Sequence, residues 1–176
     1  MATSTPNPDA GAPTPVPAPR RETLRTISAQ IAALDEMIGL ATHSIRIFDV
    51  DLSDMGWNSA ERAAILATFL RGRRDATLQI IVHETRWIES ACPRLTQLLR
   101  HYAHALTIRR TGPDARALMD PFAIVDSHHV LHRFHIEHAN AELAIGEPLA
   151  VRPLSERFEE IWASGEPGIN ATVLGL

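Results

Sequence analysis

Lysine is absent from this 176-residue sequence, so arginine supplies all 17 basic side chains. This excludes mechanisms that need a primary amine on a side chain, such as Schiff-base formation or the lysine of a P-loop. The single cysteine, Cys92, excludes an internal disulfide and a cysteine-based zinc site. Aromatic residues make up only 5% of the chain, so Leu, Ile, Val and Ala must build the core.

Long apolar runs and a strong net charge are also lacking. No stretch approaches the roughly 20 apolar residues of a membrane-spanning helix, and no signal peptide is recognisable at the N-terminus. The net charge of −4 gives no global electrostatic indication of nucleic acid or of an anionic membrane as a partner. Together with the lone cysteine, these features favour a cytoplasmic location.

The first 20 residues differ in composition from the rest of the chain. They hold six of the twelve prolines, separated mainly by Ala, Thr, Ser and Gly. Such a segment has almost nothing apolar to bury, which predicts a disordered, proline-rich tail over residues 1–20. We expect one folded domain over residues 21–166 and a short C-terminal tail over residues 167–176.

Helical and alternating patterns follow one another along the domain and predict an α/β fold. The spacing of Leu24, Ile27, Ile31, Leu34 and Ile38 predicts a first helix over residues 22–41. Further helices are expected over 58–73, opened by a capping box, over 88–104, and from Pro153 onward. Strands are expected over 44–50, 76–83, 106–110, 121–126, 130–136 and 141–145. This order favours a mostly parallel or mixed sheet flanked by helices.

Two segments carry a resemblance to a known family. They are Phe122-Ala-Ile-Val-Asp126, followed by Val130-Leu131, and Arg152-Pro-Leu-Ser-Glu-Arg-Phe-Glu-Glu-Ile-Trp162. They resemble one half of a phospholipase D-like protein, in which a strand enters the Asp of a His-x-Lys-x4-Asp motif and an aromatic helix closes the fold. With Ile-Phe-Asp-Val-Asp-Leu and Ile-Ile-Val-His-Glu-Thr-Arg, the chain is similar to an uncharacterised bacterial group of that superfamily.

The catalytic motif does not carry over to this chain. If Asp126 matches the Asp of the motif, Pro121 takes the place of the lysine and Met119 that of the histidine. The superfamily reaction needs the histidine as nucleophile and the lysine to balance charge on the phosphoryl oxygens. The resemblance therefore implies a degenerate domain without phosphodiesterase activity. Because catalytic members join two motif halves, it also implies a homodimer.

A histidine cluster and an acidic cluster allow other interpretations. Five of the nine histidines fall within residues 128–138. With Asp126 they could serve a metal-dependent hydrolase or phosphodiesterase, although steps of three along a strand send successive side chains to opposite faces. Asp49, Asp51 and Asp54 follow a strand and could hold Mg²⁺ or simply form a solvated loop. We expect neither a bound metal nor a cofactor.

The sequence thus predicts a binding or regulatory module rather than an enzyme. Its ligand would be a phosphorylated small molecule or a protein partner. A phosphorylated ligand is included because the guanidinium group of arginine can bind phosphate through two N–H groups without cleaving it. A helix N-terminus after Arg152 would also receive an anion. The candidate ligand-binding residues are Asp126, His132, Arg133, His135 and Arg152.

Overall fold

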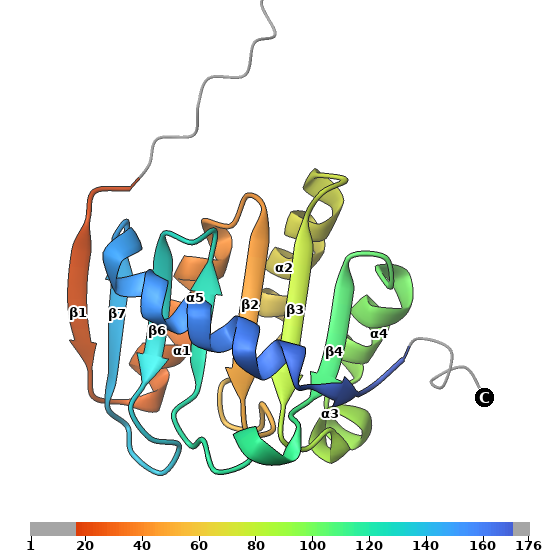
Figure 1. Ribbon diagram of the computed structural model, residues 1–176. Helices are drawn as coiled ribbons and strands as arrows, with labels where there is room; N and C mark the ends of the chain where they lie inside the picture. Colours follow the sequence, from red (N-terminus) through yellow and green to blue (C-terminus); the bar gives the residue numbers. More distant parts are fainter. Residues whose placement is uncertain (1–16, 171–176) are drawn as a thin grey trace, which may run out of the picture.

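An eight-stranded mixed sheet runs through the molecule, which the computed structural model describes over residues 17–170 (Figure 1). The strand order is β1-β7-β6-β5-β2-β3-β4-β8. The strands are β1 (Arg20–Leu24), β2 (Ser44–Asp49), β3 (Thr77–Val82), β4 (Leu106–Arg110), β5 (Phe122–Val125), β6 (His129–Arg133), β7 (Ala141–Ile145) and β8 (Glu166–Pro167). The helices are α1 (Ile27–Gly39), α2 (Ala60–Gly72), α3 (Arg86–Ala91), α4 (Pro93–His101), the 3-10 turn η1 (Pro113–Ala115) and α5 (Pro148–Ala163).

Helices cover both faces of the sheet, which confirms the predicted α/β class. β2, β3 and β4 are parallel to one another, whereas β5, β7, β1 and β8 are each antiparallel to their neighbours. On one face, Ile47 and Leu78 pack in the core that includes residues of α1, α2 and α4. On the other, Phe48 and Phe122 pack against α5 through Phe158. None of the described helices has the length and apolar character needed to cross a bilayer.

The first predicted helix is too long at its N-terminal end. Residues 20–24 form β1, which pairs with β7, and α1 begins only after Thr26. The Thr26 side chain accepts the backbone N–H of Ala29 and caps the helix. Leu24 fits the helical spacing, yet it is also the one buried residue of β1. Of the predicted tails over 1–20 and 167–176, residues 1–16 and 171–176 lie outside the described part of the chain, whereas Arg20 belongs to β1 and Pro167 to β8.

Two other helix boundaries differ from the prediction. The helix expected over residues 88–104 is divided into α3 and α4, because Pro93 has no N–H to continue α3 and instead opens α4. α2 is capped by Ser59, whose Oγ accepts the N–H of Arg62, rather than by Asn58. Asn58 instead accepts the backbone N–H of Arg94 and ties the start of α2 to α4.

The closing helix begins five residues earlier than predicted. Pro148 lies in the first turn of α5, and Pro153 lies inside the helix. Arg152 therefore does not precede the helix but projects from its second turn, where it pairs with Glu156 and is exposed. Phe158 is fully buried and stacks on the partly buried Trp162 with a ring separation of 5.6 Å.

Candidate functional site

One edge of the sheet concentrates charged and polar side chains. β2, β3, β4 and β6 end at this edge and β5 begins there, at the bottom of the sheet in Figure 1. We call it the polar edge; its residues are Asp49, Asp54, His83, Asp120, His132, Arg133 and Arg157. Because strand side chains alternate between faces, these residues divide into two clusters on opposite sides of the sheet.

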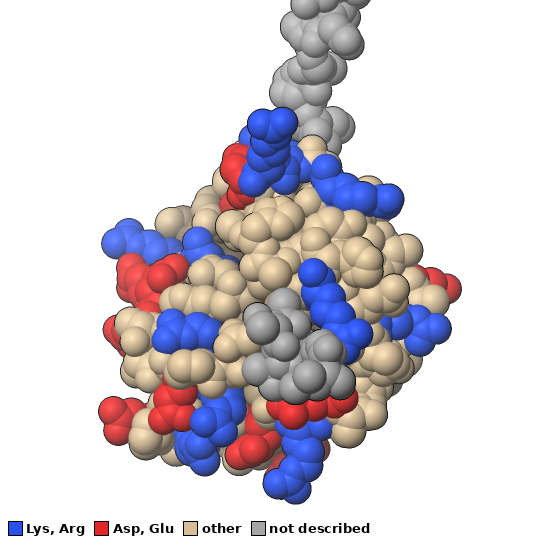
Figure 2. Space-filling model, turned by 90° about the vertical axis from the view of Figure 1, so that its right-hand side faces the viewer, with Lys and Arg blue, Asp and Glu red and all other residues tan. Residues whose placement is uncertain are grey.

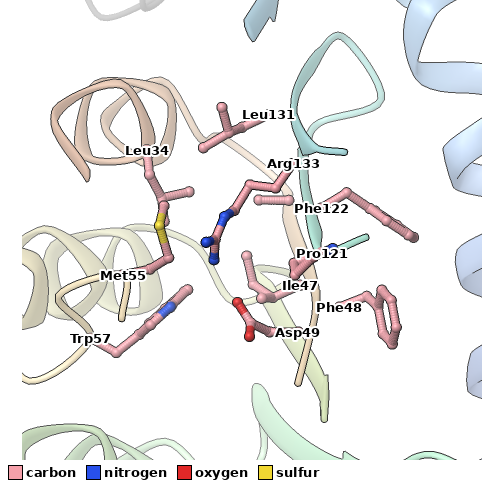
Figure 3. A pocket seen from close by; sticks show the side chains of 11 residues that line it. Leu34, Ile47, Phe48, Asp49, Met55, Trp57, Pro121, Phe122, Leu131 and Arg133 are labelled. Atoms are coloured by element: carbon pink, nitrogen blue, oxygen red, sulfur yellow. The ribbon is translucent and has the colours of Figure 1, made fainter. Parts of the chain in front are cut away.

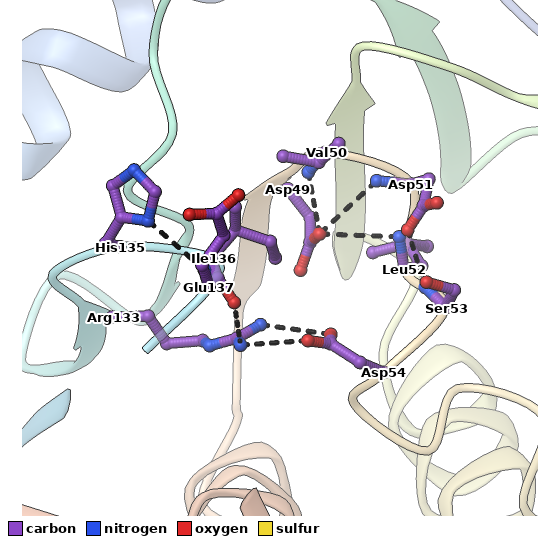
Figure 4. Close-up of polar contacts among 10 residues, drawn as sticks. All are labelled: Asp49, Val50, Asp51, Leu52, Ser53, Asp54, Arg133, His135, Ile136 and Glu137. Carbon is purple, nitrogen blue, oxygen red and sulfur yellow. Dashed lines mark hydrogen bonds and ion pairs between the residues drawn. The ribbon is translucent and has the colours of Figure 1, made fainter. Parts of the chain in front are cut away.

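On the side of α1 and α2, Arg133 and Asp54 form a bidentate ion pair. The Arg133 Nη1 and Nη2 atoms donate to the Asp54 carboxylate at 3.0 and 2.9 Å, and Nη2 also donates to the carbonyl of Ile136 at 3.1 Å (Figure 4). Arg133 is only 2% exposed. The pair therefore fixes loop 50–59, which carries Asp54, to the end of β6.

Asp49 is a buried acid in the same cluster. Its Oδ1 accepts the N–H of Val50 at 2.6 Å and those of Asp51 and Leu52 at 3.4 Å each. Burial raises the pKa of Asp49 to about 6, and the neighbouring charge of Asp54 adds to the rise against the opposing charge of Arg133. Carboxyl groups whose pKa is raised by burial beside charged partners are found at functional sites, so Asp49 is a candidate site residue.

On the side of α5, Asp120 is held between Arg157 and His132. The Arg157 Nη2 atom donates to Asp120 Oδ1 at 2.7 Å, and His132 Nε2 lies 3.1 Å from Oδ2. Burial alone would raise the pKa of Asp120, but the hydrogen bonds from Arg157 and His132 outweigh it and hold that pKa below its usual range. The His132 ring packs edge-on against Phe122 and Phe134. Both oxygens of this carboxylate therefore accept hydrogen bonds, which favour its ionised form.

Asp126 lies at the opposite edge of the sheet, in the turn between β5 and β6. Its carboxylate accepts the backbone N–H groups of Thr42, His43 and Ser44 at 2.5, 2.7 and 2.7 Å, and the Thr42 hydroxyl at 2.8 Å. Asp126 and Ser127 both have positive φ, which suits a tight hairpin. The hydrogen bonds outweigh burial and keep the pKa of Asp126 below its usual range. The residue joins the hairpin to the start of β2.

The predicted ligand-binding residues do not gather in one cleft. His132 and Arg133 share the polar edge but face opposite sides of the sheet, Asp126 lies at the other edge, and Arg152 lies on the surface of α5. His135 follows β6 in the loop of the polar edge, where its Nδ1 accepts the N–H of Glu137. A groove of about 610 Å³ does lie beside Asp126, but the residues that line it exclude the other four.

The histidine cluster is divided in the same way. His128 and His129 follow the turn at Asp126, and Nδ1 of His129 accepts the N–H of Gly146. Burial lowers the pKa of the His129 ring. His132 and His135 belong to the opposite edge. Within residues 17–170, no three His, Cys, Asp or Glu side chains are arranged to hold a metal ion. The predicted alternative of a metal site shared with Asp126 has no geometric support.

Several residues of the polar edge are missing from the sequence prediction. Asp120 and Arg157 are 37 positions apart, and only the packing of α5 across the sheet brings them together. His83 follows β3 and is fixed by Thr111 at 2.8 Å and by the carbonyl of Leu118 at 2.7 Å. The sequence signal for such residues is their position, because polar residues at the carboxyl ends of parallel strands meet at one edge of the sheet.

Comparison with solved structures defines the class of fold. The chain is similar to the archaeal chromatin protein TrmBL2, whose structure shows a novel mode of DNA binding (14% identity, TM-score 0.63, covering 92% of this chain and 57% of TrmBL2). It is also similar to Nuc from Salmonella typhimurium, a phospholipase D family member (16% identity, TM-score 0.62, covering 85% of this chain and 97% of Nuc). NucT from Helicobacter pylori matches at 14% identity with a TM-score of 0.57, over 86% of this chain and all of NucT.

These likenesses establish a phospholipase D-like fold. The chain spans little more than half the length of TrmBL2. A family model described as "Domain of unknown function (DUF7931)" matches residues 26–174, and the chain belongs to that family. No curated protein matches the sequence.

Proposed function

We propose that this protein is a phospholipase D-fold domain without phosphoryl-transfer activity, which acts as a binding module through its polar edge. The observation that carries the proposal is the pair Met119 and Pro121, which directly precede β5 at this edge, where the resemblance places histidine and lysine. Neither side chain supplies a nitrogen nucleophile or a cation. No lysine elsewhere in the sequence replaces the missing one.

The charge pairing at the polar edge favours a protein partner over a phosphorylated small molecule. Arg133 is engaged by Asp54, and Arg157 is engaged by Asp120, each through two guanidinium nitrogens. A phosphate would have to displace a carboxylate from one of these arginines before it could bind. Two arginines that are already neutralised give little attraction to an anion.

Exposed apolar side chains at the same edge support the protein partner. The exposed large hydrophobic residues of the described chain are Met119, Phe134 and Leu149, at 40%, 51% and 84%. Met119 and Phe134 both lie at the polar edge, where the carbonyl of Met119 accepts the N–H of Ile136. Leu149 lies in the first turn of α5, away from this edge. A second copy of the chain is the partner that we propose, because a symmetric dimer would cover both apolar side chains.

The absence of phosphodiesterase activity is tested with generic phosphodiester substrates. We expect the wild-type protein and the His132→Ala variant to hydrolyse bis(p-nitrophenyl) phosphate no faster than buffer. His132 is the appropriate probe because it is the polar-edge histidine that a carboxylate orients. Turnover by the wild type that the substitution abolishes would show a working nucleophile at this edge and refute the proposal.

Self-association is tested by sedimentation at tens of micromolar. We expect a dimer for the wild type, a monomer for Phe134→Ser, and an unchanged dimer for Leu149→Ser, the matched loss of an exposed apolar side chain elsewhere. A wild-type monomer would remove the second copy as partner. A dimer that only Leu149→Ser disrupts would move the interface away from the polar edge.

A further inference from the structure

A small cavity lies between loop 50–59 and the sheet, on the α1 side of the polar edge. Its walls are mostly apolar, and its polar groups come from Asp49, Trp57 and Arg133 (Figure 3). The centre of a water-sized molecule has about 20 Å³ in which to move. A cavity needs about 10–15 Å³ by this measure to hold one water molecule, so the space fits one such molecule and nothing much larger.

Two buried donors at this cavity have no hydrogen-bond partner within the described chain. They are the indole Nε1 of Trp57 and the guanidinium Nε of Arg133, and each residue is only 2% exposed. The other two nitrogens of Arg133 are occupied by Asp54 and Ile136. An unpaired buried donor is costly, and two such donors at one cavity point to a shared acceptor.

Asp49 supplies the complementary group. Its Oδ1 receives the backbone N–H groups of loop 50–59, which leaves Oδ2 for another donor. No hydrogen bond or ion pair of the described chain joins Asp49 to Arg133, although their charged ends point toward the same space in Figure 3. The required occupant therefore accepts two hydrogen bonds and donates one.

We propose that this cavity is a binding site for a single ordered water molecule, which accepts hydrogen bonds from Trp57 Nε1 and Arg133 Nε and donates one to Asp49 Oδ2. Three partners are typical of a buried water. An anion of similar size is disfavoured because the carboxylates of Asp49 and Asp54 lie beside Arg133, the one cationic side chain among the described residues that line the cavity. The water joins loop 50–59, through Trp57, to the ends of β2 and β6.

The indole side of the site is held rigidly, which makes it a good reporter. The Arg62 guanidinium lies 4.9 Å above the Trp57 ring, and Arg62 in turn pairs with Asp35 on α1 at 2.7 Å. The chain has three tryptophans, so a ¹⁵N spectrum holds three indole signals. The Trp57→Phe variant assigns the relevant one by its disappearance.

The test is a water-selective NMR experiment on the ¹⁵N-labelled protein. We expect a cross-peak between water and the Trp57 indole proton whose rotating-frame sign is that of dipolar transfer rather than of proton exchange. Ala123→Val adds two methyl groups at a residue that lines the cavity and should abolish this cross-peak. The wild-type measurement decides alone if that variant does not fold.

Three results would overturn the proposal. The wild type could show no dipolar cross-peak at Trp57. A folded Ala123→Val variant could retain the cross-peak, which would place the water outside the cavity. Titration with sodium bromide could shift the Trp57 signal saturably while Trp87 and Trp162 stay unchanged, which would make the occupant an anion.

Discussion

Replacing Asp49 by asparagine should stabilise the folded protein at neutral pH and change little in acid. The carboxyl group is 3% exposed and lies within reach of the charge of Asp54. Asparagine has nearly the same shape as the protonated acid, and its carbonyl oxygen can still accept the N–H of Val50. The substitution therefore removes the cost of a buried charge and keeps the main hydrogen bond.

The size of the effect follows from the pKa of Asp49, which rises from 3.8 to about 6 on folding. A difference of about two pH units between the folded and unfolded states corresponds to about 3 kcal/mol. Stability therefore changes with pH in the direction opposite to that produced by an ion-paired carboxylate, whose pKa is lowered on folding. Below about pH 4 both states of wild-type Asp49 are protonated; between pH 4 and 6 the unfolded state loses its proton first, so stability falls as pH rises.

Urea denaturation of both proteins at several pH values between 4 and 8 measures this difference. We expect the free energy of unfolding of Asp49→Asn to exceed that of the wild type by little at pH 4 and by about 3 kcal/mol at pH 7. Asp114→Asn, at an exposed residue, controls for the loss of one negative charge. A difference between Asp49→Asn and the wild type that is the same at pH 4 and pH 7 would refute the reasoning.

Three further substitutions test the architecture around the site, all by urea denaturation at pH 7. Asp126→Ala removes the carboxylate that accepts the N–H and hydroxyl of Thr42 and the N–H groups of the next two residues. It should lower the free energy of unfolding by about 1.5–3 kcal/mol. An unchanged free energy of unfolding would show that the hairpin does not depend on this carboxylate. Phe158→Ala should lower the free energy of unfolding by about 3–5 kcal/mol because Phe158 is fully buried. Trp162→Ala should lower it by less because Trp162 is only partly buried. A larger loss for Trp162→Ala than for Phe158→Ala would contradict the packing of α5.

Six of the eight described strands could be predicted from the sequence because their signals are local, whereas β1 lies mostly in the segment with the helical pattern and β8 at the start of the predicted C-terminal tail. β2 and β3 are short runs of β-branched and apolar residues bounded by polar ones, and both were found within one or two residues. The helix boundaries were less predictable. Leu24 matches the period of α1 but is drawn into β1 by pairing with β7, a contact across more than a hundred residues. Tertiary pairing overrides the local pattern there.

The candidate site was only partly predictable, for a similar reason. That His132 and Arg133 face opposite sides follows from their adjacency in a strand, so the alternation alone argues against a common ligand. The pairing of Arg157 with Asp120 depends on how α5 crosses the sheet, and no local pattern encodes that crossing. The sequence shows the acids after β2, but burial of Asp49 and pairing of Asp54 with Arg133 are properties of the folded chain.

The polar edge differs from a phosphodiester-cleaving site in the balance of its charges. Phosphoryl transfer needs cations that are free to meet the charge on the phosphoryl oxygens. Here each arginine of the edge already faces an aspartate, and the remaining acid, Asp49, adds negative rather than positive charge. Two exposed large apolar side chains, Met119 and Phe134, lie at this edge, with exposed polar residues such as Glu137 and His138 beside them. This balance of charges, together with the exposed Met119 and Phe134, is what supports the proposal of a protein partner at this edge.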